Sequence, residues 1–233
     1  MGLFDFLKKK TSTKSGEERK METHKNLQLM GITINPHLPL LETTEEVTVK
    51  SKDDICRRAI ASLLAIQVAC DISQGDATEE TVAFFRETLS NFGVADCLND
   101  TEYRVVFSDT YTERDVISVI WTYEAYWSLV WSLSLIDDIK SASSCCDGET
   151  AVRLVSECDT YEQFANKCQL RSSEEILDML DLYYRYHWAC VNKQFDPDTA
   201  IGNLNSEVVM ERRRGLEWLI SEEDDWFEIS LDT

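Results

Sequence analysis

The chain has 233 residues, of which 43% are hydrophobic and 10% aromatic, so it is long and apolar enough to bury a substantial core. It contains only eight Gly and three Pro, which argues against a many-turned β architecture and favours long helices joined by short loops. A formal net charge of −20 argues against binding to nucleic acid or to an anionic membrane, and favours a basic protein partner.

Residues 1–26 form a basic leader on this acidic chain. They hold seven Lys/Arg against four Asp/Glu, a net of +3, so the other 207 residues carry −23. Apolar Phe4 and Leu7 precede three lysines, which gives at most a weak contact with a membrane surface. Position 6 is Phe6 and not the Ser or Thr that a myristoylation signal needs. We therefore expect a flexible leader over residues 1–26 and no stable membrane association.

Residues 27–233 are expected to form a single helical domain. Its first part, residues 27–50, holds two of the three prolines and reads as an extended segment that wraps the helical body, with room for a short strand. Helices then begin at Ser51, which resembles an N-cap, and after Gly75, where we expect Asp76 to be the N-cap.

The most apolar stretch lies near residues 113–138. Thr112 and Asp115 resemble a capping box at its start, and about 21 residues that follow are apolar on every side. That length would span a bilayer, but Glu124 lies at mid-span and Asp137-Asp138 follow immediately. The sequence predicts one continuous buried helix at the centre of the fold.

Two further helices and an acidic tail complete the chain. A capping box at Ser172 opens a long helix over about 173–194, and a final helix follows over about 206–220. In the acidic C-terminal tail, residues 221–233, apolar and polar residues alternate, which predicts a short docked strand. The predicted fold class is all-α, a multi-helix globular bundle around the helix near 113–138, with at most one or two short peripheral strands.

The eight cysteines are dispersed through predicted helices and loops. None forms a CxxC pair, and the adjacent Cys145 and Cys146 suit neither a zinc site nor an ordinary disulfide. We expect reduced thiols, a cytoplasmic location, and no metal or other cofactor.

Glu124, His187 and Arg212 are polar residues at positions where the helical pattern expects apolar ones. An unpaired buried carboxylate is costly, so we expect Arg212 to bind Glu124 as a bidentate partner. Gly215, one turn after Arg212, would let another helix come close. By contrast, each of Arg58 and Arg185 follows an Asp by four positions and reads as part of an exposed pair.

Two interpretations of this polar set stay open. In one, it is a satisfied network that fixes how the helices pack. In the other, Glu124 is a general acid or base and His187 accompanies it in a pocket. The sequence offers no nucleophile motif, phosphate loop or zinc-binding spacing, so it designates no catalytic residue.

Several runs in the chain resemble an uncharacterised bacterial family known as domain of unknown function 4272. They are residues 184–189 (YRYHWA), 211–220 (ERRRGLEWLI), 121–127 (WTYEAYW), 56–59 (CRRA) and the ending 225–233 (DWFEISLDT). The resemblance covers about residues 45–233. Where this chain has Arg213, Gly215 and Glu217, members of the family tend to have His, Ala and Asn. The resemblance implies a bacterial intracellular protein and brings no activity.

The function expected from charge and from the lack of catalytic motifs is that of a non-enzymatic, protein-binding module for a basic partner. An immunity protein that neutralises a toxin is one form of such a module. The alternatives are an enzyme that uses Glu124 and His187, and a homo-oligomeric structural protein. The sequence leaves the oligomeric state and the partner open.

Overall fold

The computed structural model describes residues 13–108 and 110–233, and these residues are helices and irregular segments without a strand. The prediction of an all-α bundle is therefore confirmed, and the peripheral strands that it allowed are not present in these ranges. The helices are α1 (Gly16–Leu29), α2 (Lys52–Gln74), α3 (Glu79–Asn91), α4 (Asp100–Phe107), α5 (Glu113–Trp121), α6 (Tyr123–Ser132), α7 (Gly148–Ser156), α8 (Tyr161–Lys167), α9 (Ser173–Phe195) and α10 (Ser206–Trp218), with 3-10 turns η1 (Ala95–Cys97) and η2 (Trp226–Glu228).

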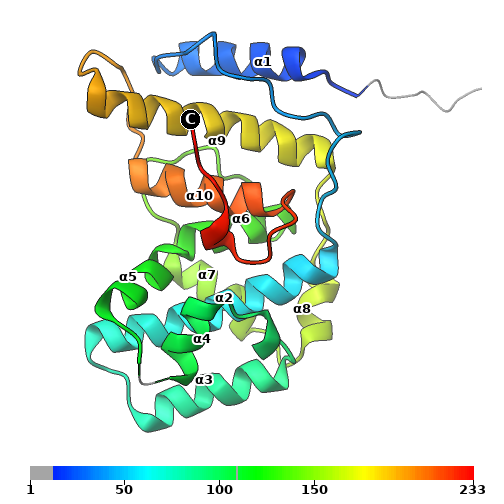
Figure 1. The fold of residues 1–233 in the computed structure, drawn as a ribbon. Helices are drawn as coiled ribbons and strands as arrows, with labels where there is room; N and C mark the ends of the chain where they lie inside the picture. Colours follow the sequence, from blue (N-terminus) through cyan, green and yellow to red (C-terminus); the bar gives the residue numbers. More distant parts are fainter. Residues whose placement is uncertain (1–12, 109) are drawn as a thin grey trace, which may run out of the picture.

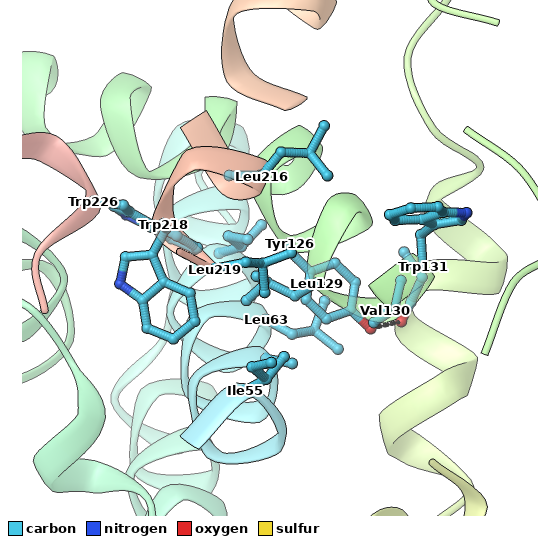
Figure 2. Packing of buried hydrophobic residues seen from close by; sticks show 14 of the residues in the cluster. Ile55, Leu63, Tyr126, Leu129, Val130, Trp131, Leu216, Trp218, Leu219 and Trp226 are labelled. Atoms are coloured by element: carbon cyan, nitrogen blue, oxygen red, sulfur yellow. Dashed lines mark hydrogen bonds between the residues drawn. The ribbon is translucent and has the colours of Figure 1, made fainter. Parts of the chain in front are cut away.

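The core lies where α6 and α10 pack against each other, with α9 on one side and α2 on the other. Figure 1 shows the same order from α1 and α9 at one end to α3 at the other. Side chains from α2, α6 and α10 converge in this core (Figure 2), among them Leu63, Leu129 and Leu216, each at most 2% exposed. Burying leucines and aromatic residues in this way is the main favourable contribution to folding.

Gly215 sets the distance between α6 and α10. A Cβ atom at this position would lie 2.5 Å from the carbonyl oxygen of Ala125 and 3.0 Å from Cβ of Ser128. The Ser128 hydroxyl donates a hydrogen bond to the Arg212 carbonyl at 3.0 Å, which ties the two helices together at the same level. The predicted close approach at Gly215 is confirmed.

The predicted continuous central helix is wrong, because the chain breaks between α5 and α6 at Thr122. The Thr122 hydroxyl donates to the Val119 carbonyl at 2.6 Å and so competes with the backbone hydrogen bond that would continue the helix. The predicted caps at Thr112, Ser51 and Ser172 are all present. The second helix is capped by Thr78 and not by Asp76. No helix of the described residues combines the length and apolar character of a membrane span.

The predicted flexible leader is wrong for residues 16–26, which belong to α1. Ser15 caps this helix in a capping box with Glu18, and Arg19 in its second turn is only 1% exposed. The basic composition of the segment suggested exposed, flexible chain. Its cations instead bind carboxylates of α9 and a backbone carbonyl, which fixes the segment as a helix against the body. The leader's Phe4, Phe6 and Leu7, with the membrane contact considered for them, lie outside the described residues.

The predicted strand in the tail is also wrong. Asp225 caps η2 through a hydrogen bond from the Phe227 amide at 2.9 Å, and Trp226 is fully buried. The alternation of apolar residues in this tail reflects one deeply buried tryptophan followed by partly buried side chains. The extended segment predicted over 27–50 begins later, because residues 27–29 are the end of α1. Residues 30–50 are irregular chain, and the Lys50 amide donates to the Leu219 carbonyl at 2.8 Å.

Candidate functional site: a groove between α1 and α9

Glu124 and Arg212 form the buried pair that their sequence positions predict, but the predicted bidentate contact is wrong, because Arg212 binds only one of the two carboxylate oxygens. Arg212 Nε lies 2.7 Å from Glu124 Oε2, and both side chains are at most 3% exposed. The second carboxylate oxygen, Oε1, accepts the Cys146 backbone N–H at 2.6 Å. Glu124 therefore has partners on both oxygens and needs no cavity to be tolerated in the core.

The rest of the Arg212 guanidinium holds the loop that follows α6. It donates to the carbonyl oxygens of Ile139 (3.1 Å), Ser141 (2.6 Å) and Ser144 (3.4 Å), and to the Tyr183 hydroxyl (3.2 Å). Tyr183 itself donates to the Ile139 carbonyl. Glu124 and Arg212 thus fix residues 139–146 against the body of the fold.

His187 does not accompany Glu124. Its Nδ1 lies 2.8 Å from Nη1 of Arg213, the neighbour of Arg212 on another side of α10. Burial, together with the positive charges of Arg213 and Arg214, lowers the pKa of His187 to about 4, so the imidazole is neutral near pH 7. A neutral Nδ1 can accept a hydrogen bond from the guanidinium, which is the geometry found.

Arg213 holds the C-terminal tail. Its two Nη atoms donate to the carbonyls of Leu231 (3.0 Å) and Asp232 (3.1 Å), and its Nε lies 3.1 Å from Glu217. Arg213 and Glu217 are therefore partners in one ion pair, one turn apart on α10.

The two arginines predicted to lie in exposed pairs are buried. Arg185 does bind Asp181, at 2.6 Å, but both side chains are at most 2% exposed. Arg58 binds Glu102 and not Asp54, through a bidentate contact at 2.6 and 2.8 Å, and its guanidinium stacks 3.8 Å from the ring centre of Trp226. An Asp four positions before an Arg indicates that the two can pair on a helix, but it does not indicate whether the pair is exposed to solvent.

A groove of about 1160 Å³ lies between α1 and α9. The two helices run in the same direction (Figure 1), joined near one end by Lys14 and Arg19 to Asp178 and near the other by the Tyr186 hydroxyl to Met30 Sδ. Each helix contributes one face at helical spacing. The lining residues are Arg19, Glu22, Thr23 and Asn26 from α1, with Met30 at its C-cap, and Glu175, Asp178, Met179, Leu182 and Tyr186 from α9.

The third wall of this groove is the loop fixed by Arg212. Asp137, Asp138 and residues 140–143 line it, and residues 202–204 close it near Tyr186. The Tyr186 hydroxyl donates to the Lys140 carbonyl at 3.4 Å, which adds a second attachment of the loop to α9. The polar network in the core therefore holds in place the loop that lines the groove on the surface.

The groove joins apolar surface with carboxylates. Its deep residues include Trp131, Met179 and Leu182, at most 8% exposed, while Leu29 and Met30 at its edge are 78% and 49% exposed. Three cations also line it: the guanidinium groups of Arg19 and Arg171 already bind chain carbonyls and carboxylates, whereas Lys140 is exposed on the loop. Asp137 and Asp138 are exposed at the loop edge. These features suit a ligand with both apolar groups and positive charge.

Neither Glu124 nor His187 lines this groove, nor a second hollow of about 690 Å³ beside the start of α2. In the described part of the chain, no three His, Cys, Asp or Glu side chains gather in a way that would hold a metal ion. Sequence reasoning missed the groove because it assigned α1 to a flexible leader. The signal that could have revealed α1 is the capping box Ser15 to Glu18.

Comparison with known proteins gives one match. No curated protein and no solved structure matches the chain. The family model described as "Domain of unknown function (DUF4272)" matches residues 19–229, which include most of α1 as well as the core. The chain therefore belongs to the DUF4272 family.

Proposed function

We propose that this protein is a binding module that takes a basic, amphipathic segment of a partner protein into the groove between α1 and α9. The observation that carries the proposal is the placement of exposed apolar side chains, Leu29 and Met30, beside a loop edge with two exposed carboxylates, Asp137 and Asp138. Apolar surface left open next to exposed carboxylates is typical of a site for an amphipathic partner. The net charge of −20 would also speed the approach of such a partner.

The contacts that hold the loop favour a structural role in binding, and not a catalytic role, for Glu124 and Arg212. Glu124 and Arg212 have their hydrogen bonds satisfied by the chain and hold the loop that forms one wall of the groove. Their role in this proposal is to keep the wall in place. All eight cysteines are free of disulfides, in keeping with a reducing compartment such as the bacterial cytoplasm.

The test is the affinity for a labelled peptide that alternates Lys with Leu and Phe, measured by fluorescence anisotropy. Reversing the loop charges with Asp137→Lys/Asp138→Lys should weaken binding at least tenfold. The matched control, Glu80→Lys/Glu87→Lys, makes the same charge change on exposed positions of α3, at the far end of the molecule (Figure 1), and should have a much smaller effect.

Two further measurements separate the apolar and charged contributions. Leu29→Asp should also weaken binding, since Leu29 is 78% exposed and its replacement leaves the core intact. Raising the salt from about 0.05 to 0.5 M should weaken binding steeply, because exposed charges are screened. Equal affinities for the loop variant and the α3 control would overturn the proposal.

A further inference from the structure

We infer that the groove has an occupant within the chain itself: residues 1–12, which would bind it and compete with the partner segment. The inference rests on the proposed function and adds the regulation of the same groove. It starts from composition. Residues 1–12 read MGLFDFLKKKTS, with five large apolar residues and one Asp followed by three lysines. This is the chemistry that the groove suits.

The chain enters the described structure beside the groove. Lys14 Nζ lies 2.6 Å from Asp178 and 2.7 Å from Glu22, and both of these carboxylates line the groove. Ser15 then starts α1, the helix that forms one of its walls. A basic side chain from this part of the chain therefore already binds the acidic residues of the groove at one end.

Reach does not limit the proposed contact. Twelve residues in extended form span up to about 40 Å. The α9 face of the groove runs from Glu175 to Tyr186, which is roughly 16 Å of helix. The segment is long enough to turn back from Lys14 and lie along the groove, with Phe4, Phe6 and Leu7 on its apolar floor and Lys8 to Lys10 near Asp137 and Asp138.

Tethering makes even a weak contact effective. A short linker gives an effective concentration in the millimolar range. At about 1 mM, a segment with a dissociation constant of about 0.1 mM would occupy the groove about nine-tenths of the time and weaken binding of a partner about tenfold. The partner would have to displace the segment, so the segment sets the partner concentration at which the module responds.

The experiment compares three proteins with the same labelled Lys/Leu/Phe peptide: the full chain, the chain without residues 1–12, and a chain in which residues 1–12 are replaced by Gly/Ser of equal length. The deletion retains Ser15, so the cap of α1 is kept. Both altered chains should bind the peptide about tenfold more tightly than the full chain. An unlabelled peptide of residues 1–12 should compete with the labelled peptide on the truncated chain.

Point changes in the full chain refine the test. Phe4→Ser/Phe6→Ser and Lys8→Glu/Lys9→Glu/Lys10→Glu should each raise the affinity for the labelled peptide part of the way towards that of the truncated chain. Light scattering over a range of protein concentrations checks that the effect arises within one chain. If the tenfold difference disappears on dilution along with a dimer, the occupant comes from a second copy and the inference is overturned.

The outcomes distinguish this inference from the proposed function. Equal binding by all three chains overturns the inference and leaves the proposed function standing. Tighter binding after deletion but not after Gly/Ser replacement shows that bulk, and not the sequence of the segment, obstructs the groove, which also overturns it. An absence of binding by all three chains overturns the proposed function and, with it, the inference that rests on it.

Discussion

Arg212 and Arg213 are neighbours on α10, equally buried, and each holds a non-helical segment by its carbonyl oxygens, yet their surroundings differ. Arg212 faces a fully buried carboxylate, Glu124, while Arg213 faces Glu217, which is 20% exposed, and a neutral His187. Burial lowers the pKa of both guanidinium groups. Attraction from Tyr183 and Glu124 outweighs burial and raises the pKa of Arg212, whereas burial prevails and lowers the pKa of Arg213.

The difference shows that two buried arginines do not need the same degree of compensation. Arg212 holds the loop that forms a wall of the groove, and its counter-charge, Glu124, is buried beside it. Arg213 holds the C-terminal tail, and its counter-charge, Glu217, retains contact with water. Removing a counter-charge should therefore cost much more at Arg212 than at Arg213.

The largest effect is expected for Glu124→Gln. The change keeps the shape of the side chain but leaves the buried Arg212 without its anion, so the free energy of unfolding should fall by about 3–5 kcal/mol. Urea denaturation of the variant and of Glu87→Gln, an exposed control on α3, measures the difference. Adding Arg212→Met should cost less than the sum of the two single changes, because the residues touch. A variant that melts above the parent would instead favour a catalytic role for Glu124.

An intermediate effect is expected for His187 as the pH falls. The folded pKa of about 4 lies below the ordinary value of 6.5, so the unfolded chain binds more protons between these two pH values. Stability from this group is complete above pH 6.5 and is lost as the pH falls towards 4, by on the order of 2–3 kcal/mol. Subtracting the pH profile of His187→Gln from that of the parent isolates this contribution. Parallel profiles would contradict the description of the Arg213 side.

The smallest effect is expected for Glu217→Gln. Glu217 is partly exposed and its i,i+4 pair with Arg213 is screened, so the loss should be about 1 kcal/mol. Burial raises the pKa of Glu217, so the folded parent takes up a proton before the unfolded chain does and gains stability as the pH falls through that pKa. The cost of the substitution should therefore be larger in mild acid than at neutral pH. If this variant loses as much stability at neutral pH as Glu124→Gln, the contrast between the two arginines is wrong.

Sequence reasoning predicted the helical class, the Glu124–Arg212 pair and the close approach at Gly215, because each depends on spacing within a helix and on the cost of burying a charge. It could not find the partner of Arg58, since Glu102 lies 44 positions away on a helix that the pattern did not indicate. It joined α5 to α6 because apolar periodicity does not detect a threonine hydroxyl that competes with the backbone. The groove escaped it for a related reason: its two helices are brought together by contacts about 160 residues apart.

Those contacts give the chain an order of assembly. Arg19 binds Glu174 and Asp178, which lie 155 and 159 positions later in the chain, so α1 has no α9 to bind when it leaves the ribosome. At about 5–20 residues per second, synthesis would leave it waiting for roughly 8 to 30 s. The first helix of the described chain can thus dock only after most of the chain has been made, and until then the face that carries Arg19 is open to other proteins in the cell.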